Sequence, residues 1–149
     1  MPQFTALIRA ESTLGLAETL RSARVASETL VIHPSDATIE RVCFRYGARD
    51  KFDVPGVTLG AYAMDAFYDW LLILRPGEEL SGDLLDELGR WRPKRDSNAG
   101  YLLRIGDGSP QFRLINRDEM HWVGELPPAP SDAALFPGAI TMAAPRRAA

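Results

Sequence analysis

Cysteine and histidine are the scarcest functional side chains in this sequence. The 149 residues include one cysteine, Cys43, and two histidines, His33 and His121. A single cysteine forms no disulfide within the chain. So few thiol and imidazole ligands also argue against a structural zinc site of the usual four-ligand type. From the sequence we expect neither a metal nor a cofactor.

Lysine is nearly as rare, with 2 lysines against 15 arginines. Such a skew is typical of GC-rich codon usage and points to a bacterial or phage origin.

The net charge of −3 argues against nucleic acid as the main partner, because nonspecific binding to nucleic acid depends on positive charge. No basic segment followed by a long apolar stretch opens the chain, so a cytoplasmic protein that binds no membrane is expected.

Glycine-rich phosphate loops are also missing. Neither GxGxxG nor GxxxxGK[ST] occurs, and both of these motifs hold phosphate on backbone N–H groups. The glycines of Gly106-Asp107-Gly108 have the wrong spacing and predict a hairpin turn instead.

The longest apolar run is LGAYAMDAFYDWLLIL, residues 59–74. Only one glycine and two aspartates interrupt it, so the pattern predicts a helix that is covered on several sides. We expect Phe67, Trp70, Leu71 and Leu74 to be buried in it. Two charges and sixteen residues make the run a poor candidate for a membrane span.

The remaining patterns predict a single α+β domain over residues 1–126. Strands are expected at 3–10, 28–33 and 38–46, the last pairing with 51–54, and a weak helix is expected after Ser12. The alternation of apolar and other side chains over 38–46 favours the strand, whereas the Pro34-Ser35-Asp36 entry before it favours a helix start. A second helix, capped by Ser81, is predicted over 83–91. A three-stranded meander from Tyr101 to Leu126 is expected to follow, with Arg104 and Arg113 facing away from the core. This order favours a mainly antiparallel sheet with two or three helices packed on one face.

Composition changes at Pro127. Residues 127–149 hold five of the eleven prolines and only three charged residues. This pattern predicts a Pro/Ala-rich tail or docking arm, which lies on its own core or on a neighbouring molecule. Its apolar side chains, together with Trp70, are the expected partner contacts: Leu135, Phe136, Ile140 and Met142.

Four polar residues are candidates for a ligand site. Asp65 and Asp69 stand four apart, a spacing that suits shared acid–base work or simply a solvated helix face. His121 and Arg104, from the meander, are the other two. Cys43 and His33 suggest a nucleophilic pair if their strands are neighbours, although Cys43 between valine and phenylalanine is more typical of a small buried residue.

The densest basic patch is Arg90-Trp91-Arg92-Pro93-Lys94-Arg95. Bases around an aromatic ring suit phosphates and single-stranded nucleic acid. The same pattern is typical of a helix end whose basic residues complement the helix dipole.

Two classes of function remain open. The first is a non-enzymatic protein–protein interaction module of the immunity, inhibitor, virion or secretion type, which acts through another protein or through self-association. The alternative is an enzyme or small-ligand binder whose polar site lies around Asp65, Asp69, His121 and Arg104. Converging polar groups in a pocket would favour the alternative.

Overall fold

A single mixed sheet organises the computed structural model, which describes residues 3–143. Within this range the strands are β1 (Thr5–Arg9), β2 (Glu28–His33), β3 (Arg49–Phe52), β4 (Trp70–Leu74), β5 (Glu78–Leu80), β6 (Gly100–Ile105), β7 (Gln111–Asn116) and β8 (Ala134–Met142). The α-helices are α1 (Leu16–Ser22), α2 (Ala37–Arg45), α3 (Leu59–Ala63) and α4 (Gly82–Arg90), with 3₁₀ turns at Ala23–Val25 and Pro93–Arg95. The expected strand at 28–33 and helix at 83–91 are present.

The strand order is β3-β2-β1-β4-β7-β6-β8-β5. The first four strands in this order are parallel to one another, and β8 is parallel to β6. The other pairs are antiparallel. The predicted mainly antiparallel sheet is therefore wrong. Helices α1 and α2 connect β1, β2 and β3 as crossovers, and a crossover helix returns the chain in the same direction.

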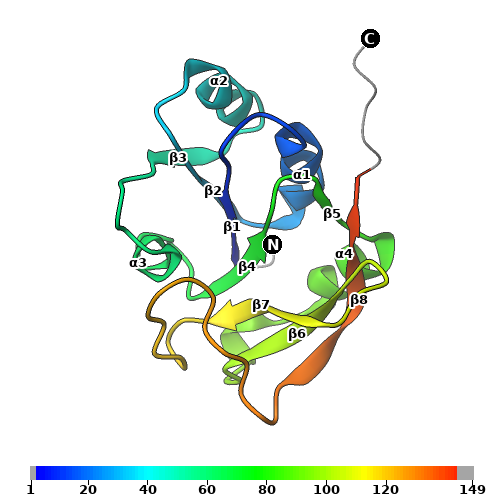
Figure 1. Ribbon diagram of the computed structural model, residues 1–149. Helices are drawn as coiled ribbons and strands as arrows, with labels where there is room; N and C mark the ends of the chain where they lie inside the picture. The colour runs from blue at the N-terminus through cyan, green and yellow to red at the C-terminus, as the bar shows by residue number, and fades with distance from the viewer. Residues whose placement is uncertain (1–2, 144–149) are drawn as a thin grey trace.

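Helices cover both faces of the sheet, which corrects the prediction that they pack on one face. Side chains from α1, α2 and α4 join one apolar cluster, and α3 belongs to a second cluster with the segment 120–126. Figure 1 shows α3 on the opposite side of the sheet from α1 and α4. Parallel strands are normally buried on both faces, so their sequences lose the polar–apolar alternation that marks a half-exposed strand.

Strand β4 shows what this loss does to a sequence pattern. The run 59–74 is not one helix, because α3 ends at Ala63 and residues 70–74 form β4. All five residues of β4 are buried, with Trp70 and Leu72 in one cluster and Leu71 in the other. A strand buried on both faces has the same continuous apolar pattern as a core helix. The expected burial of Trp70 is confirmed, whereas Phe67, between the two elements, is 75% exposed.

Helix α2 replaces the strand expected over residues 38–46. The side chain of Asp36 accepts hydrogen bonds from the backbone N–H groups of Thr38, at 2.8 Å, and Ile39, at 3.4 Å. This N-cap satisfies two of the N–H groups that a helix start leaves without partners. A helix forms here instead of a strand because this cap is combined with the burial of Ile39 and Cys43. These two residues are four apart, so they lie on the same face of a helix.

Strand β8 takes the place of the expected third strand of the meander. Residues 120–126 contain no strand, and β8 lies between β6 and β5 instead (Figure 1). Phe136 and Ile140 are buried in the main cluster, while Leu135 and Met142 are 42% and 62% exposed. Most of the described part of the predicted tail therefore adds a strand to the chain's own sheet, and residues 144–149 lie outside the described residues.

A bulge in β7 reverses the expected direction of Arg113. Leu114 pairs with Tyr101, but Phe112 pairs with Leu102, so Arg113 is an extra residue in its strand. A bulge of this kind disrupts alternation and re-aims a side chain. Arg113 is fully buried, contrary to the prediction, whereas Arg104 is exposed as expected.

No helix of the described residues is long and apolar enough to cross a membrane.

Asp96 fixes an aromatic cluster at the end of α4. Its carboxylate accepts hydrogen bonds from Trp91 Nε1 at 2.8 Å and Tyr101 OH at 2.6 Å, and two more from Asn98. Burial alone would raise the pKa of Asp96, but these hydrogen bonds outweigh it and lower the pKa below its ordinary value. Burial and the bond to Asp96 raise the pKa of Tyr101 to about 12.

The lowered pKa of Asp96 makes its contribution to stability dependent on pH. Its ionised form is favoured by folding, so the contribution is present above the unfolded pKa of about 4 and is lost as pH falls through the folded value. We expect Asp96→Asn to cost about 1–3 kcal/mol at pH 7. The cost should shrink below about pH 3. Urea unfolding at both pH values measures it, with Asp132→Asn as an exposed control; an equal cost at both values would contradict the assignment.

Gly138 allows β8 to contact α4. Its φ is 99°, and a Cβ built there would lie 2.5 Å from Leu84 Cα. We expect Gly138→Ala to destabilise the fold by about 2–4 kcal/mol, combining backbone strain with overpacking. Gly47 also has positive φ, but a Cβ added to it would meet nothing within 4 Å. Gly47→Ala should therefore cost about 1 kcal/mol, and equal unfolding midpoints for the two variants would contradict the close contact.

Candidate functional site

The strand order of the sheet reverses at β1, between β2 on one side and β4 on the other. The chain passes from β1 outward to β2 and β3, and then returns to add β4 on the other side of β1. In open sheets of parallel strands, ligands bind beyond the carboxyl ends of the strands at the point where the order reverses. Here that point lies beyond the ends of β1 and β4, at Arg9 and Leu74.

A groove of about 560 Å³ opens at this point. Its apolar surface comes from the ends of β4 and α3 and from neighbouring loops, and includes Leu14, Leu59, Ile73, Leu74, Pro76 and Leu126. Its polar groups are Arg9, Glu11, Ser12, Arg75 and Glu125. A second groove of about 510 Å³ shares Arg9 and Glu11 with the first and continues past Pro34 to residues 53–57. The two grooves adjoin, and both follow the carboxyl edge of the parallel strands.

Arg9 stands between the two grooves and is held from three directions. Its Nη1 donates to Glu125 Oε2 at 2.8 Å, and its Nη2 donates to the Val57 carbonyl at 3.2 Å. Its Nε lies 3.3 Å from Asp53 Oδ2, an ion-pair distance without hydrogen-bond geometry, and has no hydrogen-bond partner although it is buried. The guanidinium carbon also lies 5.7 Å from the centre of the Tyr62 ring. Arg9 therefore ties the walls of both grooves to the end of β1.

The acids around Arg9 are fixed in the same network. Glu125 Oε2 accepts a second hydrogen bond from the Leu59 N–H at 3.2 Å, at the start of α3. Tyr62 OH donates to Asp53 Oδ1 at 3.1 Å and accepts from the Val54 N–H at 2.6 Å. Both carboxylates thus serve to position the groove walls.

The turn after β4 is held by a buried ion pair. Arg113 Nη1 and Nη2 donate to the two carboxylate oxygens of Glu78 at 2.8 and 2.9 Å, and both residues are almost fully buried. Arg113 also donates to the Ile73 carbonyl at 2.9 Å, and Glu78 accepts from the Arg75 N–H at 2.6 Å. The pair therefore fixes the backbone of Arg75, which lines the groove.

The loop between β1 and α1 packs directly on this turn. Gly15 has φ 73°, and a Cβ at that position would lie 2.6 Å from the Gly77 nitrogen. The Gly77 N–H donates to the Gly15 carbonyl at 3.1 Å and to Thr19 Oγ1 at 2.9 Å, and Thr19 Oγ1 lies 3.3 Å from the Arg75 carbonyl. Only glycine allows the two backbones to approach this closely.

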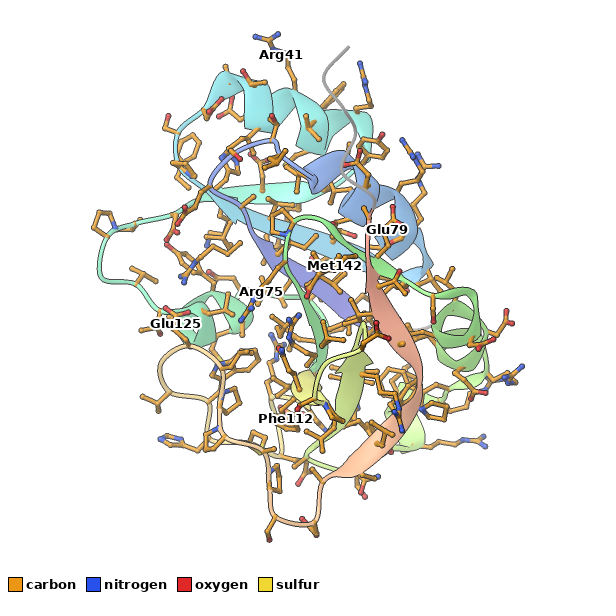
Figure 2. The ribbon with its side chains drawn as sticks, turned by 45° about the vertical axis from the view of Figure 1, so that its right-hand side comes forward. Arg41, Arg75, Glu79, Phe112, Glu125 and Met142 are labelled. Atoms are coloured by element: carbon orange, nitrogen blue, oxygen red, sulfur yellow. The ribbon has the colours of Figure 1, made fainter. Side chains whose placement is uncertain are left out.

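Arg75 and Glu11 are the uncommitted charges of the groove. Among the residues that the structure describes, neither side chain forms a hydrogen bond or an ion pair, and both are exposed. Figure 2 shows Arg75 projecting from the turn after β4 on the side of the molecule where Glu125 also lies. Over residues 3–143, no group of three or more His, Cys, Asp or Glu side chains could hold a metal ion.

The four polar residues predicted as a site are placed in different surroundings. Asp65 forms an ion pair with Lys51 at 2.5 Å, and Asp69 lies 3.2 Å from Arg117 Nε. A hydrogen bond with Asp69 raises the pKa of Asp118 above its ordinary value. Arg117 also donates to the carbonyls of Ala63, the last residue of α3, and of Ala66, just beyond it.

His121 and Arg104 are both exposed, His121 in the loop after β7 and Arg104 on β6. Within residues 3–143 no hydrogen bond or ion pair joins either of them to Asp65 or Asp69. The structure therefore does not bring the four together through contacts.

Cys43 and His33 do not form a nucleophilic pair. The ring nitrogens of His33 face the Pro34 carbonyl at 2.5 Å and Asp50 Oδ2 at 2.7 Å. Burial raises the pKa of Cys43 to about 11, and the nearby Asp50 contributes to the rise. A thiol with so high a pKa is protonated at neutral pH and is a poor nucleophile.

The basic patch lies at the opposite edge of the sheet. A hollow of about 490 Å³ there is lined by Arg92, Lys94 and Arg95 together with Trp91, and a neighbouring hollow of about 380 Å³ also contains Asp69 and Asp118. The amino ends of β1 and β4 face these hollows, so they lie away from the topological switch point.

The sequence interpretation missed the residues of the groove. Arg9, Asp53 and Arg75 each stand at or directly after the end of a short apolar or parallel strand. Polar residues in such positions meet at one edge when the strands are parallel. That signal was hidden because residues 59–74 were interpreted as a helix, which removed β4 from the expected sheet.

Comparisons with known proteins bear on the fold. No protein-family model matches the chain, and no curated protein matches it. Residues 1–349 of S. aureus TarS match 73% of this chain with 16% identity and a TM-score of 0.50. The matched part of the chain shares its fold with part of that structure. The chain spans only 38% of that structure.

Two further solved structures have lower scores. The glycosyltransferase GlyE of Streptococcus pneumoniae matches 80% of the chain at 13% identity with a TM-score of 0.46, and the chain spans 35% of it. The 4-diphosphocytidyl-2C-methyl-D-erythritol synthase of Anaerococcus prevotii matches 96% at 14% identity with a TM-score of 0.45, and the chain spans 68% of it.

The structure corrects the prediction of a non-enzymatic interaction module, because it removes both reasons for the module. The supposed over-apolar helix includes the buried strand β4, and Phe136 and Ile140 of the supposed arm lie in the chain's own core. Trp70, another predicted partner contact, is 3% exposed.

The buried pair of Arg113 and Glu78 predicts a mutational pattern. Arg113→Met leaves the Glu78 carboxylate buried without a counter-charge and should cost about 3–5 kcal/mol of unfolding free energy. The double variant Arg113→Met/Glu78→Leu removes both charges and should be markedly more stable than the single variant. Urea unfolding of the wild type, both single variants and the double variant measures the coupling energy; additive losses would contradict a paired role.

Proposed function

We propose that this chain is a small-ligand-binding domain of an enzyme-type fold, and that it holds a nucleotide, such as a nucleoside diphosphate or nucleotide sugar, in the grooves beside Arg9. The proposal replaces the site expected around Asp65, Asp69, His121 and Arg104 with one at the carboxyl edge of β1–β4. The observation that carries it is the pair of adjoining grooves at the topological switch point.

The connectivity supports this ligand class. Strands β1, β2 and β3 with helices α1 and α2 form a β-α-β-α-β unit, and β4 extends its order to 3-2-1-4. Units of this kind bind mononucleotides beyond the carboxyl ends of their strands. The likeness to TarS supports the fold only.

The chemistry of the grooves also suits a nucleotide. A ligand with one flat, weakly polar part and one charged part needs apolar walls next to a few fixed polar groups, in a cavity of about 300–1,000 Å³. The grooves offer Leu59, Leu74 and Leu126 as apolar walls and Arg75 as a cation for phosphate. Glu11 can accept hydrogen bonds from sugar hydroxyls.

Titration calorimetry with uridine, cytidine, adenosine and guanosine diphosphates tests the proposal. We expect at least one to bind the wild type with a dissociation constant of about 1 mM or tighter. Leu14→Trp places a larger side chain at the rim of the groove, where Leu14 is 84% exposed, and should weaken that binding about tenfold.

Met64→Trp is the matched control, because Met64 is also exposed, at 66%, and does not line the groove. It should leave binding unchanged. Failure of all four nucleotides to bind would contradict the proposal, as would equal effects of the two tryptophans. Self-association or a protein partner, and a cytoplasmic location, stay predictions from the sequence.

A further inference from the structure

The turn that closes β4 presents an arginine to the groove. Arg75 is the first residue after the strand, and its backbone is held at both ends, with the N–H donating to Glu78 and the carbonyl contacted by Thr19 Oγ1. Its exposed side chain has no hydrogen-bond or ion-pair partner among residues 3–143. A cation on a fixed backbone stem can neutralise an anion with little loss of backbone freedom.

The other charges of the groove are already committed or negative. Arg9 forms an ion pair with Glu125 at 2.8 Å and lies 3.3 Å from Asp53, so its positive charge is already shared between those two carboxylates. Glu11 is left as the one uncommitted carboxylate among the described lining residues of this groove. Arg75 is accordingly the group that can supply charge to an incoming phosphate.

A divalent cation is the other common counter-charge for a diphosphate, and it is usually held by one or two carboxylates together with the phosphates. The carboxylates at this groove do not fit a divalent cation. Asp53 and Glu125 are occupied by Arg9, and Glu11 shares its groove with the positive charge of Arg75, which repels a second cation.

From these observations we propose that Arg75 performs the role of a divalent cation in this groove, so that a nucleoside diphosphate binds through its guanidinium without a metal ion. The inference rests on the proposed function and specifies the charge recognition of the same site. Guanidinium suits the task because its planar fork of donors matches two phosphate oxygens at once.

Titration calorimetry with the tightest-binding nucleoside diphosphate of the panel tests this inference. Affinity should be the same in EDTA and in magnesium chloride. Arg75→Gln should weaken binding by about tenfold to a hundredfold, the range for losing a charge-assisted bidentate contact. Arg75→Lys keeps the positive charge but not the planar fork of donors, so it should lose less affinity than Arg75→Gln.

Arg41→Gln is the matched control. It makes the same change in net charge at an exposed position on α2, at the top of the molecule in Figure 2 and well away from Arg75, and should leave affinity unchanged. The parent nucleoside, which lacks phosphate, should bind the wild type and Arg75→Gln equally. That result would separate phosphate recognition from a general disturbance of the groove.

The outcomes distinguish the two proposals. If the diphosphate binds only with magnesium, or if Arg75→Gln retains full affinity, the role of Arg75 is wrong and the nucleotide site stands. If no nucleoside diphosphate binds the folded wild type under either condition, the proposed function is wrong, and the inference about Arg75 is overturned with it.

Discussion

The parallel pairing of β1 with β4 is the constraint on which the rest of this structure depends. It joins two strands that are separated by about sixty residues of chain, with Leu7 opposite Ile73 and Ile8 opposite Leu74. Both strands are buried on both faces, so helices are needed on each side of the sheet. The same pairing creates the reversal of strand order at which the grooves open. Packing and the candidate site therefore follow from one arrangement of two strands.

Charge is distributed around that pairing in two different ways. The pair of Arg113 and Glu78 is buried, and its desolvation is costly unless each charge keeps its partner and further hydrogen bonds. In this structure each charge keeps its partner and forms a further hydrogen bond, and these hydrogen bonds fix the turn that carries Arg75. At the groove itself the charges are only partly covered, with the Arg9 side chain 28% exposed. A rigid buried pair behind a solvated surface cation is an arrangement suited to holding a small charged ligand in a defined position.

Local signals in the sequence predict local structure well and connectivity poorly. Ser81 as the cap of α4, the strand at 28–33 and the hairpin of β6 and β7 follow from patterns within a few residues. The five apolar residues of β4 carry no period, so burial on two faces could not be told from a buried helix. The bulge that turns Arg113 inward depends on pairing across strands, as does the insertion of β8 beside β6. The groove was missed for the same reason: its residues meet only when the strand order is known.

Mapping of backbone amide shifts by NMR tests the central claim, that the ligand site lies at the carboxyl edge of β1 and β4. Nucleoside diphosphate would be added to isotopically labelled protein, and the perturbed amides located on the structure. We expect the largest changes around Arg9, Glu11 and Arg75, with little effect near Lys94 and Arg95 at the opposite edge. Perturbations centred on the hollows beside Lys94, with none at the end of β1, would contradict it.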